Sequence, residues 1–155
     1  MEARPPHLIF VDADACPVKE EVYKVARRHG CGVRVVSNSF MRTPPDVQLV
    51  VVDAGPDIAD DWIAERAACG AIVVTADIPL AARCLKAGAT VIGPTGRPFT
   101  QASIGLALAH RAIAEDRRAM GEATGGPAPM GPRDRSRFLS ALDEAVVRLR
   151  RRPTS

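Results

Sequence analysis

Aromatic residues make up only 4% of this chain of 155 residues, and its three lysines are outnumbered by 18 arginines. With so few rings, we do not expect nucleic-acid bases to stack on an aromatic platform. No apolar run approaches the ~20 residues of a membrane span. The start, MEARPPHLIF, lacks a signal-peptide core. The sequence therefore predicts a cytoplasmic protein with no membrane partner.

Several catalytic and metal-binding motifs are also missing. The chain has no GxSxG, P-loop or GxGxxG segment. Its four cysteines form no CxxC pair and have no histidine at zinc spacing, which argues against a zinc site. Cys31, Cys69 and Cys84 lie in or beside predicted helices and are interpreted as packed side chains. Cys16 stands beside two aspartates, so its role stays open.

Charge is divided unevenly along the chain, although the formal net charge is only +3. Residues 1–116 carry 12 basic and 14 acidic side chains, whereas residues 117–152 carry nine arginines and four acids. An acidic front and an arginine-rich tail are compatible with a metal site beside a phosphate-binding surface. On charge alone, a solvated basic helix explains the tail better.

Short Val- and Ile-rich runs alternate with helical patterns, which predicts an α/β fold: a three-layer, Rossmann-like parallel sheet covered by helices on both faces, with C-terminal helices. The whole chain, 1–155, is expected to be one domain, with a core at about 6–93 and a helical extension at about 101–152. A loop at 121–133, rich in Gly and Pro, is either a tether or a flap over the substrate. The predicted strands are 7–13, 33–37, 48–53, 71–75 and 89–93. The predicted helices are 17–29, 58–69, 78–87, 102–120 and 134–151.

Aspartates follow three of these strands. Because ligands of parallel α/β sheets bind at the carboxyl ends of the strands, these carboxylates converge if the strands are neighbours. Converging carboxylates raise one another's pKa values, and a divalent cation relieves that repulsion. Mg²⁺ or Mn²⁺ prefers such oxygen ligands and activates water for attack on a phosphodiester. The acids concerned are Asp12, Asp14, Asp53, Asp57, Asp60, Asp61 and Asp77.

Helix capping is the competing explanation for several of these acids. Asp57 and Asp77 each stand directly before a predicted helix, where a carboxylate accepts hydrogen bonds from backbone N–H groups. Asp60 and Asp61 fall in a first helical turn, which favours acids. Asp12 and Asp14 follow a buried run and have no comparable explanation.

Basic and polar residues that could bind substrate phosphates are spread along the chain. The RDRSR run at 133–137 follows the Gly-rich loop and could hold phosphates through guanidinium groups. Each arginine taken alone is better explained as a surface residue. Recognition of RNA by shape and backbone fits the sequence better than base stacking does. The substrate-binding candidates are Asn38, Arg42, Arg83, Arg133 and Arg135.

Several motifs together resemble the YaiI/YqxD family of bacterial proteins across nearly the whole chain. They are VDADACPVK (11–19), SNS and RTPP (37–45), AGPDIADDWI (54–63), VVTADIPLAARCLKAGA (73–89), TGGP (124–127) and DRSRF (134–138). This resemblance implies a PIN-like domain, a Rossmann-like fold shared with metal-dependent ribonucleases. Within that pattern the first acid corresponds to Asp12, the second to the cluster at 57–61, and the [ST]xD segment to Thr75 and Asp77.

The leading hypothesis is a ribonuclease that depends on Mg²⁺ or Mn²⁺ and has RNA as its partner. Two alternatives remain open: a phosphatase of the haloacid-dehalogenase type with Asp12 as nucleophile, and a non-catalytic nucleic-acid-binding module. The sequence does not determine the oligomeric state. The expected catalytic residues are Asp12, Asp14, Asp57, Thr75 and Asp77. The expected metal ligands are Asp12, Asp57, Asp60, Asp61 and Asp77.

Overall fold

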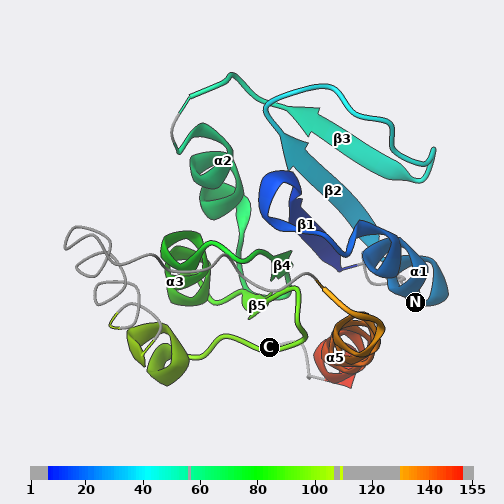
Figure 1. Cartoon of the computed structure of the whole chain (residues 1–155), viewed down its shortest axis with the longest axis vertical. Helices are drawn as coiled ribbons and strands as arrows, with labels where there is room; N and C mark the ends of the chain where they lie inside the picture. Colours follow the sequence, from blue (N-terminus) through cyan, green and yellow to red (C-terminus); the bar gives the residue numbers. More distant parts are fainter. Residues whose placement is uncertain (1–6, 56, 107–108, 110–129, 152–155) are drawn as a thin grey trace, which may run out of the picture.

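Five strands form one sheet in which every neighbouring pair runs parallel, in the order β3-β2-β1-β4-β5 (Figure 1). The computed structural model describes residues 7–55, 57–106, 109 and 130–151. The strands are β1 (Leu8–Asp12), β2 (Gly32–Ser37), β3 (Val47–Val51), β4 (Ile72–Val74) and β5 (Thr90–Ile92). The helices are η1 (a 3₁₀ turn, Ala13–Ala15), α1 (Lys19–His29), α2 (Ile58–Arg66), α3 (Ile78–Lys86) and α5 (Pro132–Arg151).

Helices cover both faces of the sheet, which confirms the predicted three-layer α/β architecture. On one face, Ile9 and Val11 of β1 share a buried cluster with α1 and α5. On the other face, Phe10 shares a second cluster with α2 and α3. Figure 1 shows these two helix pairs on opposite sides of the sheet. Successive residues of a strand point to opposite faces, so a strand covered on both sides is apolar along its length, as β1 is from Leu8 to Val11.

The predicted boundaries need small corrections. The first strand stops at Asp12 and not at residue 13, because the chain enters the 3₁₀ turn η1. The strand predicted at 48–53 ends at Val51, and the helix predicted at 58–69 ends at Arg66. Residues 101–106 are helical, as the helix predicted at 102–120 requires. Most of the rest of that helix, and residues 121–129 of the loop predicted at 121–133, lie outside the described residues, whereas residues 132 and 133 already belong to α5.

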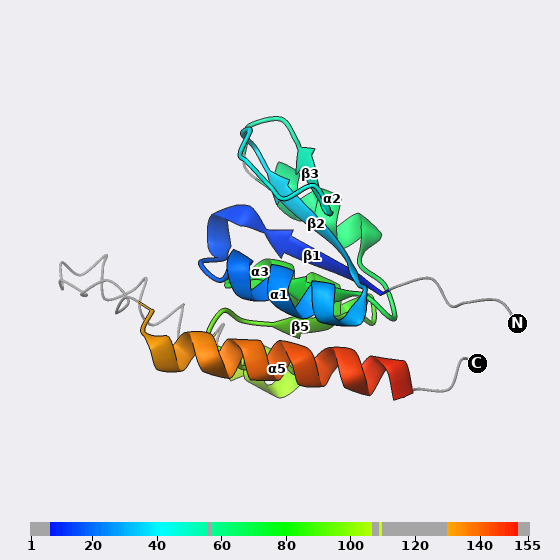
Figure 2. The ribbon, with the colours of Figure 1, turned by 90° about the vertical axis from the view of Figure 1, so that its right-hand side faces the viewer.

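The long helix α5 packs along the sheet as part of the core. Phe138, Leu142 and Val146 are fully buried and belong to the same cluster as β1. Gly96, in the turn after β5, lies directly against its backbone: a Cβ placed there would stand 2.7 Å from the carbonyl oxygen of Arg137. Figure 2 shows the start of α5 on the same side of the molecule as η1 and the head of the β1 arrow. The arginine-containing first turns of α5 therefore lie near the carboxyl ends of the strands.

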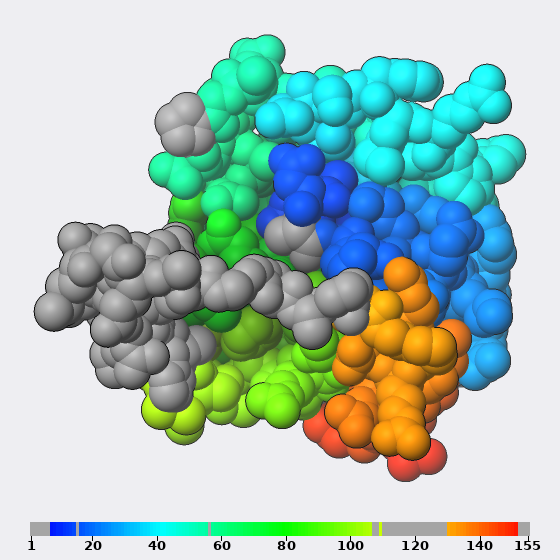
Figure 3. Space-filling model, viewed as in Figure 1, coloured from blue at the N-terminus to red at the C-terminus, as the bar shows by residue number. Residues whose placement is uncertain are grey.

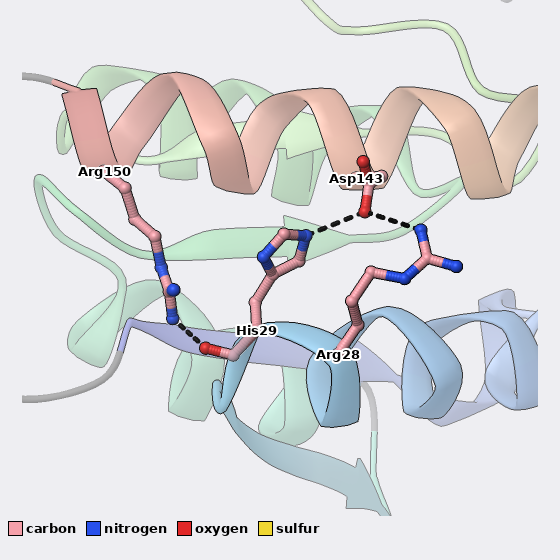
Figure 4. A network of polar contacts seen from close by, with 4 residues as sticks. All are labelled: Arg28, His29, Asp143 and Arg150. Carbon is pink, nitrogen blue, oxygen red and sulfur yellow. Dashed lines mark hydrogen bonds and ion pairs between the residues drawn. The ribbon is translucent and has the colours of Figure 1, made fainter.

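A polar network joins the far part of α5 to the end of α1 (Figure 4). Nε2 of His29 lies 2.8 Å from Oδ1 of Asp143, and Nη1 of Arg28 donates to the same oxygen at 3.1 Å. Arg150 donates to the backbone carbonyl of His29. These partners hold the pKa of Asp143 below its usual value, mainly through the hydrogen bond from His29. No described helix is long and apolar enough to cross a membrane.

Candidate functional site

The three buried polar side chains of the described residues lie at the carboxyl ends of the three inner strands of the sheet. Asp12 ends β1, Ser37 ends β2 and Thr75 follows β4. Their exposed fractions are 5%, 3% and 0%. Since β1 lies between β2 and β4 in the sheet, all three strands bring their carboxyl ends to the same place. Burying polar groups costs free energy unless they are hydrogen-bonded. Polar side chains buried at these strand ends therefore need hydrogen-bond partners.

Thr75 connects two of the predicted site aspartates. Its Oγ1 donates to Oδ2 of Asp12 at 2.9 Å and accepts from the backbone N–H of Asp77 at 3.0 Å. Oδ1 of Asp77 in turn accepts from the N–H of Leu80 at 3.0 Å and caps α3. The capping role considered for Asp77 is therefore real. It occupies one carboxylate oxygen and does not prevent Asp77 from lining the pocket described next.

An acidic pocket of about 320 Å³ opens at the carboxyl ends of these strands. In Figure 3, the residues that follow β1 (blue) lie at the centre of this face, next to the segment that follows β2 (cyan). Five of the eight lining residues are aspartates, and none is a lysine or arginine. The lining residues are Asp12, Asp14, Asn38, Gly55, Asp57, Ala59, Asp60 and Asp77.

The carboxylates of the acidic pocket repel one another, which raises the pKa values of Asp60 and Asp12. Burial, followed by the negative charges of Asp77, Asp12 and Asp57, raises the pKa of Asp60 to about 6. Burial also raises the pKa of Asp12, against the lowering effect of the hydrogen bond from Thr75. Two nearby carboxylates, Asp77 and Asp14, raise it further. A cation in the pocket would reverse these shifts, because it stabilises the charged form of each group.

Asp57 has an unusual backbone that helix capping does not explain. Its φ of 65° makes it the one described residue other than glycine with a positive φ. Its side chain forms no capping hydrogen bond with α2, although it precedes that helix. Asp tolerates the left-handed region better than most residues, yet the conformation still costs free energy. The strained backbone belongs to a residue that lines the pocket.

Two predicted site residues bind each other and not the pocket. Oδ1 of Asp61 accepts from Nη1 of Arg83 at 2.7 Å, in an exposed ion pair between α2 and α3. Neither residue lines the acidic pocket. Asp53 is exposed and also lies outside the lining. Of the seven aspartates that follow the strands in the sequence, only five therefore meet at the pocket.

The remaining arginine candidates lie outside the lining of the pocket. Arg42 is exposed in the segment between β2 and β3, and Arg133 is exposed in the first turn of α5. Arg135 donates to the carbonyl oxygen of Pro17 at 3.1 Å, which ties the start of α5 to the start of α1. None of the three lines the acidic pocket, whereas Asn38 does. Contact between these arginines and a substrate requires a ligand that extends beyond the pocket.

The donor set of the acidic pocket fits a hard divalent cation. Every candidate ligand is a carboxylate or amide oxygen, as Mg²⁺ and Mn²⁺ prefer. Among the described residues, no group of three or more His, Cys, Asp or Glu side chains is close enough to enclose an ion unaided. Mg²⁺ commonly takes one or two carboxylates and completes its shell with water and substrate phosphates. The residues present therefore fit an open site that is shared with a substrate.

Two features of this site were not visible in the sequence. Ser37 belongs to the SNS motif but was not a candidate site residue, and its burial next to the end of β1 follows only from the strand order. Cys16, whose role was left open, is buried, and burial raises the pKa of its thiol to about 11. A thiol with that pKa is protonated at neutral pH, so it is a packed side chain and not an activated nucleophile.

The fold and the pocket define a class: a three-layer α/β protein with an acidic pocket at the carboxyl ends of its central parallel strands. The sequence matches the model of the family described as "Uncharacterized BCR, YaiI/YqxD family" over residues 10–148, and the chain belongs to that family. This confirms the resemblance drawn from the motifs.

Relatives of similar length support the assignment. A UPF0178 protein of Azorhizobium caulinodans is 61% identical over 97% of this chain and 97% of its own. A UPF0178 protein of Caulobacter sp. (strain K31) is 62% identical over 93% of this chain and 97% of its own. One of Rhodopseudomonas palustris (strain BisB18) is 59% identical over 94% of this chain and 96% of its own.

Proposed function

We propose that this protein hydrolyses phosphodiester bonds of RNA with the help of Mg²⁺ or Mn²⁺ bound in the acidic pocket. The observation that carries the proposal is the buried Asp12, which is held by Thr75 in a pocket with four further aspartates. Five carboxylates without a lysine or arginine among them would repel a phosphate. A divalent cation makes such a pocket able to receive one.

The roles of the individual residues follow from their positions. Asp12 and Asp77 are the proposed first ligands, because Thr75 bonds to both residues and fixes their spacing. Asp60 would contact the cation through a bound water, since it lines the same pocket and its pKa is raised by burial and then by the charges of Asp77 and Asp12. Asp14 and Asp57, both exposed at the pocket, would orient the attacking water. When bound, the cation would supply charge neutralisation and a water molecule of lowered pKa.

Thr75 acts in this proposal as a positioning residue. It is fully buried, and its hydroxyl donates to Asp12, so it sets the direction of that carboxylate. Asn38 would contact the substrate inside the pocket. Arg42, Arg133 and Arg135 would bind backbone phosphates farther along the strand, which leaves the pocket itself free of basic side chains.

The test is cleavage of labelled single-stranded RNA and DNA in the presence of Mn²⁺. Asp12→Asn and Asp77→Asn are expected to lose at least about 100-fold in rate, the scale typical of a lost electrostatic contribution in a catalytic site. Asp53→Asn is the matched control, because Asp53 lies outside the pocket lining. Equal rates for all four proteins would refute the proposal.

The same variants separate the two alternatives. A phosphatase that uses Asp12 as nucleophile would form a phospho-aspartate that Asp12→Asn abolishes. A non-catalytic module would bind RNA in a salt-dependent way, with no metal requirement and no cleavage. In that case, calorimetric titration with Mn²⁺ would give no binding heat that Asp12→Asn removes.

A further inference from the structure

Phe40 is the one fully solvent-exposed aromatic residue of this protein. All six aromatic residues of the chain lie within the described part, and the other five are buried or half-buried. Phe40 is 80% exposed. The others belong to the two core clusters or pack against them, as Trp62 does through an edge-on contact with Phe10. An exposed ring gains nothing from the core, so its position calls for a separate explanation.

The backbone of Phe40 lies close to the acidic pocket. Phe40 follows the pocket residue Asn38 by two positions, and two residues span at most about 7 Å of extended chain. Ser37 is buried at the end of β2, and its Oγ accepts from the N–H of Ser39 at 3.2 Å. This hydrogen bond fixes the direction in which the chain leaves the strand.

The residue after Phe40 keeps the ring on the outside. Met41 packs against the core cluster that contains β1 and α1. With Ser37 and Met41 anchored on either side, the backbone of the segment is held at both ends. The next residue, Arg42, is exposed. An exposed aromatic ring and an exposed guanidinium group thus stand two residues apart in the segment that follows the pocket residue Asn38.

We propose that Phe40 and Arg42 form a nucleotide subsite that selects single-stranded nucleic acid, an inference that rests on the proposed function of the acidic pocket. Phe40 stacks on the unpaired base next to the scissile phosphate, and Arg42 binds the neighbouring backbone phosphate. Aromatic side chains stack on any base, so this contact selects an unpaired strand and not a sequence. In a duplex the bases stack on each other, and the ring has no face to contact.

This subsite revises an expectation drawn from composition. A content of 4% aromatic residues argued against base stacking, but one exposed ring in the segment after Asn38 is sufficient for it. The competing use of an exposed ring is contact with another protein chain. The neighbouring groups are those of a strand-binding site, namely an arginine on one side and a pocket lined by carboxylates and an amide on the other.

The test compares Mn²⁺-dependent cleavage of three substrates of equal length: a single-stranded RNA, the same RNA with abasic positions, and a duplex. Phe40→Ala is expected to raise KM for the single strand by about 5- to 150-fold, the range of one lost stacking contact, while kcat stays within about twofold. Phe40→Trp should restore the KM. Leu106→Ala is the matched control, because it removes an exposed apolar side chain (62% exposed) that does not line the pocket.

The outcomes distinguish the subsite from the proposed function. If the wild type cleaves RNA and Phe40→Ala does so with an unchanged KM, or if the duplex is cleaved as well as the single strand, the subsite is wrong and the nuclease stands. If the wild type cleaves nothing, anisotropy of a labelled single-stranded 12-mer without divalent ions tests the subsite alone. Weaker binding by Phe40→Ala then supports it. A change in oligomeric state with unchanged RNA binding overturns it in favour of a protein contact.

Discussion

Thr75 and Asp12 are 63 residues apart in the sequence and are joined by a buried hydrogen bond of 2.9 Å between Oγ1 and Oδ2. The bond crosses from the end of β4 to the end of β1, two strands that are neighbours in the sheet. It satisfies one of the few buried polar groups of the core and directs a carboxylate into the acidic pocket. Structure and proposed chemistry depend here on the same hydroxyl group.

Replacing that hydroxyl should affect both stability and metal binding. Thr75→Val keeps the shape but leaves Asp12 without a donor and the N–H of Asp77 without an acceptor, at a cost of about 1–3 kcal/mol. Because the lost hydrogen bond lowers the pKa of Asp12, that pKa should rise. Urea denaturation and the pH profile of Mn²⁺ binding measure the two effects. Thr75→Ser should retain both properties, and Thr90→Val, half-buried on β5, should change neither.

The acidic pocket should make stability fall as pH rises when no metal is present. The pKa of Asp60 is raised from its ordinary 3.8 to about 6, so the folded state holds a proton that the unfolded state releases. Stability is therefore lost between about pH 4 and pH 6. Asp60→Asn should remove this part of the pH dependence in thermal melts. Adding Mg²⁺ or Mn²⁺ should raise Tm above pH 6 in the wild type, whereas an unchanged Tm would argue against a cation in the pocket.

The contact between His29 and Asp143 should have the opposite pH dependence. The pKa of Asp143 is lowered in the fold by His29 and Arg28, so its contribution is present above the ordinary pKa of 3.8 and is lost as pH falls below it. Asp143→Asn should cost about 1 kcal/mol at pH 7, the scale of a partly exposed ion pair. Its difference from wild type should vanish in acid. Glu144→Gln is the control, because its exposed pair with Arg148 contributes little.

At Gly96, the turn after β5 lies too close to α5 to accommodate a side chain. Gly96→Ala would place a Cβ against the backbone of Arg137 at a residue with φ of +88°, which L side chains rarely adopt. Backbone strain alone costs about 1–2 kcal/mol, and the overlap with α5 adds to it. Gly105→Ala is the control, since a Cβ there meets nothing within 4 Å and lies in a helical segment. Denaturation of the two variants should therefore shift in opposite directions.

The sequence by itself determined the local structure. Runs such as LIFV, apolar at every position, are typical of strands covered on both faces, and they predicted the parallel sheet and its helical layers. Gly30, with φ of 68°, ends α1 where a left-handed residue is required. The aspartates that follow the strands were visible as well, because strand ends can be located from local patterns.

Only the tertiary structure decided which of those aspartates meet. The order β3-β2-β1-β4-β5 puts β4 beside β1 although two strands separate them in the sequence, and this brings Asp77 to Asp12. Asp61 follows the same local pattern as Asp60 but pairs with Arg83, since adjacent residues of a helix point in different directions. Likewise, only the packing shows that Met41 lies against the core while its neighbour Phe40 is exposed. Strand order and side-chain direction depend on packing between distant segments, and no local pattern contains that information.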